Sequence, residues 1–177
     1  MQAKRTNDPR ILTIDLRAQR FGYAVFEGPK QLLDWGARFY PPGGKSGAVV
    51  AGNRIAALIK AFPPTVIVVR KVRHKMMRNS AGVQPILKAI RREASTHSIP
   101  VHFVARSEVR EAFRILRAKS TYEIAGILTA IFPELLWRLP HKRKTYESEH
   151  PVMSIFDAIA LGFTYWQLNG AWMPPPE

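Results

Sequence analysis

The fold is decided by the stretch Ile11-Leu12-Thr13-Ile14-Asp15-Leu16. Its apolar and β-branched residues predict a buried β-strand, because such side chains pack well on a pleated surface. A carboxylate inside this strand costs free energy unless it is paired or binds a cation. Asp15 is therefore a catalytic or metal-binding acid, the partner of a neighbouring base such as Arg17, or a strand-end residue that caps the turn to Arg20.

The segments around this strand predict the rest of the fold. Two further strands, expected at residues 21–26 and 31–40, follow after short turns, as in an antiparallel meander. Strands and helices then alternate, which favours a mixed α/β sheet covered by helices. The expected later strands are residues 65–69 and 101–104, and the expected helices are residues 49–62, 83–95, from 107, 121–132 and 151–168.

Length and composition indicate one domain. The 177 residues suffice for a single core, which we expect at residues 10–170, between a flexible basic arm at 1–9 and a frayed tail at 171–177. The absence of cysteine excludes disulfides, thiolate catalysis and Cys-ligated zinc. Neither a signal peptide nor a membrane span is recognisable, so we expect a cytoplasmic protein with no membrane partner.

The charge indicates a polyanionic partner. Lys and Arg number 27 against 13 Asp and Glu, a net charge of +14. Nucleic acid is the usual partner of such a chain, although a solubilising surface, an anionic membrane or an acidic protein are alternatives. Two basic runs, at residues 70–78 and 141–144, favour a nucleic-acid groove. The candidate contacts are Arg70, Lys71, Arg73, Lys75, Arg78, Lys142, Arg143, Lys144 and, by stacking, Tyr146.

A second isolated acid lies in the last expected helix. This helix is apolar on nearly every side, so Asp157 is expected to be buried or at a cleft. It either forms an ion pair with one of the many arginines or acts together with Asp15. Carboxylates that converge from separate elements are what a two-metal nuclease needs to hold Mg²⁺ or Mn²⁺.

The sequence resembles the RuvC-type Holliday junction resolvases of the RNase H-like superfamily. The similar motifs are the first strand, Phe21-Gly22-Tyr23-Ala24-Val25, Leu33-Asp34-Trp35-Gly36 and Phe156-Asp157-Ala158-Ile159-Ala160-Leu161. The resemblance spans residues 11–165. It implies an RNase H-like sheet of five strands, three antiparallel and then two parallel, and a site of about four acids.

Two of the four acidic positions that the resemblance implies are not acidic here. Asp15 and Asp157 match the first and the last. Arg70 stands where the family has Glu, and Ser154 stands where it has Asp. Glu149 is the candidate replacement, as a third catalytic and metal-binding acid, although it is also placed to cap the last helix.

Two functions follow from these residues. The resemblance implies a Mg²⁺- or Mn²⁺-dependent endonuclease for branched DNA, acting as a homodimer. The alternative is a catalytically degenerate RNase H-like module that binds DNA or RNA without cutting. Arg70 either pairs with an aspartate, filling the place of a metal, or turns outward to hold phosphate. The bases that follow it favour the outward orientation.

Overall fold

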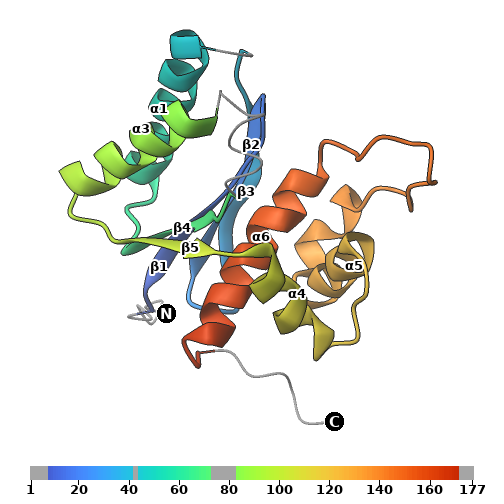
Figure 1. Ribbon diagram of the computed structural model, residues 1–177. Coiled ribbons are helices and arrows are strands. Elements are labelled where there is room, and N and C mark those ends of the chain that lie inside the picture. The colour runs from blue at the N-terminus through green and yellow to red at the C-terminus, as the bar shows by residue number, and fades with distance from the viewer. Residues whose placement is uncertain (1–7, 42–43, 73–82, 172–177) are drawn as a thin grey trace.

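The first three strands form the predicted antiparallel meander (Figure 1). The computed structural model describes residues 8–41, 44–72 and 83–171. The strands are β1 (Arg10–Leu16), β2 (Arg20–Glu27) and β3 (Leu32–Phe39). Gly28 has a positive φ of 69° in the turn after β2, a conformation that glycine adopts without steric cost. This tight turn brings β3 back along β2.

Two parallel strands complete a five-stranded sheet. Strand β4 (Val66–Arg70) pairs with β1, and β5 (Val101–Val104) pairs with β4. The order across the sheet is β3-β2-β1-β4-β5, so β1 is central. The predicted mixed α/β sheet of three antiparallel and two parallel strands is therefore confirmed.

Helices cover both faces of this sheet (Figure 1). One face packs against α1 (Gly44–Ala61) and α3 (Val83–Thr96). The other packs against α4 (Arg106–Arg114), α5 (Thr121–Ile131) and α6 (Met153–Leu168). Because side chains alternate along a strand, Asp15 shares the α6 face of β1 with Ile11 and Thr13.

Helix α6 lies directly on β1 and β2. Thr13 Oγ1 donates a 2.7 Å hydrogen bond to the carbonyl of Ala158. Gly22 pairs with Asp15 across the sheet, and a Cβ at Gly22 would lie 1.8 Å from the carbonyl oxygen of Ser154. The missing side chain of Gly22 thus lets the start of α6 approach the strand end that carries Asp15.

Two helix starts differ from the expected ones by two residues or more, and one element was not expected. Helix α1 begins at Gly44 rather than residue 49, and Gly47 allows its first turn to approach Pro41, whose carbonyl oxygen would lie 2.4 Å from a Cβ there. An unexpected 3₁₀ helix, η1 (Pro133–Arg138), follows α5. Helix α6 begins at Met153, two residues later than expected. Most of the expected arm at 1–9 and of the expected tail at 171–177 lies outside the described residues.

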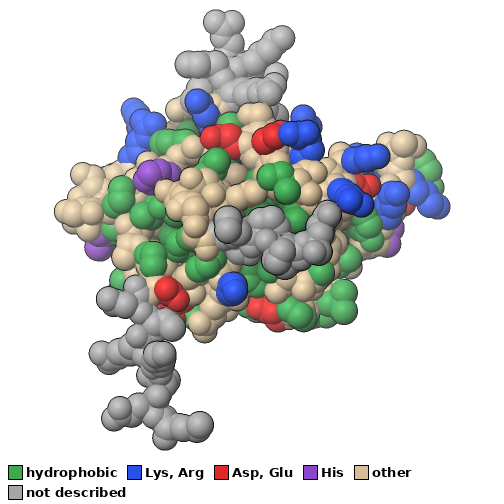
Figure 2. Space-filling view, turned by 90° about the horizontal axis from the view of Figure 1, so that it is seen from below, with side chains coloured by type: hydrophobic (Ala, Val, Ile, Leu, Met, Phe, Trp, Pro, Cys, Tyr) green, Lys and Arg blue, Asp and Glu red, His purple; other side chains and the backbone are tan. Residues whose placement is uncertain are grey.

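The surface at the amino end of β1 carries both acidic and basic side chains. Figure 2 looks onto this end, and basic, acidic and hydrophobic side chains are intermingled there. Within the described residues, no helix is long and apolar enough to cross a bilayer. The concentration of arginines lies instead near the opposite end of β1, where the two candidate aspartates meet.

Candidate functional site

Asp15 lies at the carboxyl end of β1 and is completely buried. The parallel strand β4 ends beside it with Arg70. The carboxyl ends of parallel strands are where α/β proteins usually place their sites. The sheet therefore puts a buried acid and a base at the same edge.

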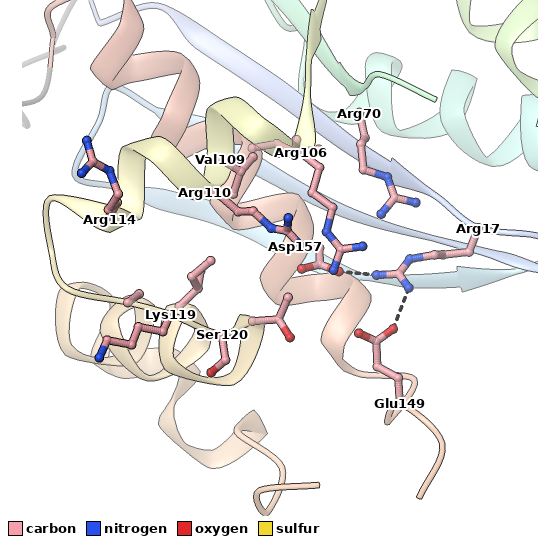
Figure 3. Close-up of a pocket in the computed structure, with 14 residues that line it drawn as sticks. Arg17, Arg70, Arg106, Val109, Arg110, Arg114, Lys119, Ser120, Glu149 and Asp157 are labelled. Atoms are coloured by element: carbon pink, nitrogen blue, oxygen red, sulfur yellow. Dashed lines mark hydrogen bonds and ion pairs between the residues drawn. The ribbon is translucent and has the colours of Figure 1, made fainter. Parts of the chain in front are cut away.

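Arg17 binds three carboxylates at once. Its Nε lies 2.8 Å from Asp15 Oδ2, its Nη1 lies 2.7 Å from Glu149 Oε2, and its Nη2 contacts Asp157 Oδ2. Figure 3 shows the guanidinium between Glu149 and Asp157. The Tyr40 hydroxyl donates to the Arg17 carbonyl and so fixes the backbone of this residue. The three predicted acids therefore converge, as expected, but they converge on an arginine.

Arg70 closes the other side of Asp15. Its Nε lies 2.9 Å from Asp15 Oδ1, as an ion pair without hydrogen-bond geometry, and its Nη2 donates a 3.0 Å hydrogen bond to the Leu16 carbonyl. The expectation that Arg70 turns outward is wrong. A fully buried carboxylate needs compensating charge, and Arg70 supplies it from the neighbouring strand. We call Arg17, Arg70, Asp15, Glu149 and Asp157 the Arg17 cluster.

The Arg17 cluster has one more carboxylate than it has guanidiniums. Two guanidiniums face three carboxylates. Burial, reinforced by the negative charge of Asp15, raises the pKa of Asp157 to about 7, although Arg17 opposes the shift. Burial disfavours the charged form of Arg17, but its three carboxylate partners outweigh this and raise its pKa. This environment therefore favours the protonated form of Asp157 more than water does.

The Arg17 cluster does not fit a divalent cation in this conformation. Every carboxylate that would bind the metal holds a guanidinium instead. Ser154, at the remaining acidic position, is fully buried and donates its hydroxyl proton to the Pro151 carbonyl. In the part of the chain that the structure describes, no group of three His, Cys, Asp or Glu side chains is arranged to hold a metal. Metal binding by Asp15, Asp157 and Glu149 remains a prediction.

Comparison with known proteins rests on structure alone. No protein-family model matches this chain, and no curated protein does. Thermus thermophilus RuvC, solved in complex with a Holliday junction substrate, superposes with a TM-score of 0.69 at 18% identity, covering 92% of this chain and 97% of that one. A second structure of Thermus thermophilus RuvC gives a TM-score of 0.68 at 17% identity, covering the same shares of the two chains.

A eukaryotic structure agrees. The yeast mitochondrial Holliday junction resolvase superposes with a TM-score of 0.58 at 16% identity, over 90% of this chain and 79% of that one. This chain has the RuvC fold. The fold that the sequence resemblance implied is thereby confirmed, whereas identities this low carry no statement about activity.

A basic loop lies beside the Arg17 cluster in this RuvC fold. We give this name to residues 139–152, between η1 and α6. Lys142, Arg143, Lys144 and Tyr146 are all exposed there, and the Lys144 ammonium lies 5.8 Å from the Tyr146 ring centroid. These side chains are free to meet a phosphate backbone. Lys71, after β4, is also exposed, whereas Arg73, Lys75 and Arg78 lie outside the described residues.

The sequence reasoning missed two features of this RuvC fold. Arg17 was considered only as a partner of Asp15, and its contacts with the acids of the later segments come from tertiary folding. Three arginines of α4 also line the cavity beside the Arg17 cluster. Their spacing was a usable signal, because residues four apart share one face of a helix. They are Arg106, Arg110 and Arg114.

Proposed function

We propose that this protein uses its RuvC fold to bind nucleic acid, such as branched or duplex DNA. In this proposal arginines take the place of metal ions, so the protein does not cut the strand that it binds. One observation carries the proposal: Arg17 occupies the space between Asp15, Glu149 and Asp157. Phosphodiester cleavage of the two-metal type needs those carboxylates free for cations. Because Arg17 and Arg70 offset most of the charge of these acids, the remaining basic side chains are available for phosphates.

Three observations support nucleic acid as the partner. Thermus thermophilus RuvC, which has the same fold, is solved with a Holliday junction substrate. The chain carries a net charge of +14. The basic loop also lines a small cavity with Lys142 and Arg143 that adjoins Glu149. Positive charge next to a cleft attracts phosphates by counterion release, which tolerates any sequence.

The first prediction is that binding is electrostatic. Affinity for a labelled four-way junction and for a duplex, measured by fluorescence anisotropy, should fall about a thousandfold between about 50 and 200 mM salt, as the neutralisation of about six phosphates requires. Replacing Lys142, Arg143 and Lys144 with Ala should weaken binding of all sequences alike and lower the salt slope by about 3.

The matched control is Arg54→Ala with Lys60→Ala, because these two exposed bases lie on α1, on the opposite face of the sheet. This control should leave the affinity close to that of the original protein. An affinity that does not respond to salt, or no affinity at all, would count against nucleic acid as the partner.

A metal-dependent endonuclease is the second candidate function. It is favoured by the convergence of three acids from β1, the basic loop and α6 on a single point. It requires Arg17 and Arg70 to leave the acids when nucleic acid binds. Its signature would be junction cutting that needs Mg²⁺ or Mn²⁺, stops with EDTA and disappears in Asp15→Asn and Asp157→Asn while binding persists. If either variant cut at the normal rate, this candidate would be rejected.

A further inference from the structure

A cavity of about 570 Å³ lies between α4, α5 and α6 (Figure 3). The Arg17 cluster forms only one end of it, through Arg17, Arg70, Glu149 and Asp157. The remaining wall comes from α4 and the start of α5, which the proposed function has not used. Cavities of roughly 300–1,000 Å³ take ligands of the size of one nucleotide.

The α4 wall of this cavity is basic. Figure 3 shows Arg106 and Arg110 reaching from α4 toward Asp157. Among the described residues neither has a hydrogen-bond or ion-pair partner, whereas Arg114 binds Glu111 at 2.6 Å. Arg106 also lies in the first turn of α4, where the helix dipole disfavours a cation. Two unpaired guanidiniums at a cavity wall are suited to bind an anion such as phosphate.

Four apolar side chains also line the cavity, and we call them its floor. They are Val109, Ala118, Ile124 and Leu161, and none of the described lining residues is aromatic. An apolar floor suits the flat face of a nucleobase, and the guanidiniums next to it suit the phosphate that this nucleotide carries. In a duplex, both faces of each base are covered by neighbouring bases. Only an unpaired base can therefore use this floor.

A second cavity extends the first toward the basic loop. It has a volume of about 200 Å³ and shares Ser120, Thr121 and Glu149 with the larger cavity. Its far side is lined by Lys142 and Arg143. The two cavities thus adjoin, and together they make a track from the arginines of α4 to the basic loop, with basic side chains at both ends.

We infer that this protein binds an unpaired stretch of nucleic acid along this track. One base lies on the apolar floor, its phosphates meet Arg106 and Arg110, and the strand continues to the basic loop. This inference rests on the proposed function, because it specifies which form of nucleic acid that function recognises. Junctions with unpaired nucleotides at the branch point bind through the same track, whereas an intact duplex has only the outer surface.

The test compares a labelled single strand with the duplex of the same sequence, by fluorescence anisotropy at one salt concentration. We expect the single strand to bind at least about tenfold more tightly, which corresponds to about 1.4 kcal/mol. Val109→Gln places a neutral polar side chain on the floor and should abolish this preference while duplex binding persists. Arg106→Glu with Arg110→Glu, on the exposed surface of α4, should reduce single-strand binding at least about tenfold.

The control is Arg54→Glu with Lys60→Glu, which makes the same charge change on α1 and should preserve the preference. Circular dichroism establishes that each variant is folded. If Val109→Gln is not folded, the result for Arg106→Glu with Arg110→Glu decides the outcome. Equal binding of strand and duplex, unchanged by these variants, overturns the inference and leaves the proposed function standing. Absence of any binding overturns both. A free mononucleotide that competes as strongly as the strand also overturns it, because the site then takes nucleotides rather than a strand.

Discussion

At the scale of single residues, the main feature is that two guanidiniums bind three carboxylates that converge from separate elements. Arg17 and Arg70 together contact both carboxylate oxygens of the buried Asp15. An arginine cannot lose its proton in this setting, so its positive charge is permanent. It can neutralise acids as a metal does, but it supplies no open coordination position for water or phosphate.

The Arg17 cluster should make stability depend on pH through Asp157. Its pKa is raised from 3.8 to about 7, so the folded protein keeps a proton that the unfolded chain has lost. Stability from this group is therefore full at acid pH and decreases as the pH rises toward about 7. We predict that Asp157→Asn increases the free energy of unfolding at pH 8 relative to the original protein, by about 1–3 kcal/mol.

Urea unfolding at pH 5 and pH 8 measures this difference. Glu134→Gln is the control, since it removes an exposed carboxylate on η1 and should change stability equally little at both pH values. If Asp157→Asn gave the same change at both pH values, the raised pKa of Asp157 would be refuted.

Removing the two arginines should open the acids to metal. We predict that Arg17→Ala combined with Arg70→Glu creates Mg²⁺ binding with a dissociation constant on the order of 1 mM, measured by calorimetry. The physical reason is that Asp15, Glu149 and Asp157 lose their guanidinium and gain a fourth acid beside them. Arg54→Ala combined with Lys60→Glu makes the same charge change on the exposed surface of α1 and should bind no Mg²⁺. Equal binding by this control would show that charge alone, and not the arrangement of the acids, is responsible.

At the scale of elements, the close packing of α6 on β2 brings Asp157 near Asp15. Gly22 permits this close packing, because a Cβ at this position would lie 1.8 Å from the backbone oxygen of Ser154. We predict that Gly22→Ala destabilises the protein by about 3 kcal/mol, since backbone atoms cannot yield as a side chain can. Gly126→Ala is the matched control: nothing lies within 4 Å of its Cβ, so it should stabilise α5 by about 0.5–1 kcal/mol. Chemical denaturation compares the two, and similar effects would contradict this packing.

The element order could be predicted from the sequence. The acids of the Arg17 cluster could also be predicted, but their contacts with Arg17 and Arg70 could be predicted only in part. Periodicity and turn residues placed all five strands within one or two residues, because β1 and β4 are buried on both faces and their apolar runs are short. The isolated acids were recognisable for the same reason. The orientation of Arg70 was not, because the direction of a side chain at a strand end depends on neighbours distant in sequence. The contact of Arg17 with Glu149 joins residues 132 positions apart, which no local pattern encodes.

At the scale of the whole molecule, basic side chains are unevenly distributed over the surface. Five arginines and a lysine line the larger cavity, whereas the end of the sheet in Figure 2 is mixed in sign. A field concentrated at one cleft steers a polyanion to that cleft more effectively than an evenly spread charge. A homodimer, which the resemblance to resolvases implies, would present two such clefts to a branched DNA. Sedimentation of the protein alone and with a junction should then show two copies per junction, and a single copy would argue against the dimer.

The most direct test of the central claim measures binding and cutting in the same sample. A strand-labelled four-way junction is incubated with excess protein in Mg²⁺ and in Mn²⁺, and is analysed on native and denaturing gels. Because Arg17 pairs with all three carboxylates, we predict a retarded complex in which every strand is intact. The amount of this complex should decrease as the salt concentration rises. Metal-dependent strand cleavage that is lost in Asp15→Asn would contradict the claim and would establish the endonuclease instead.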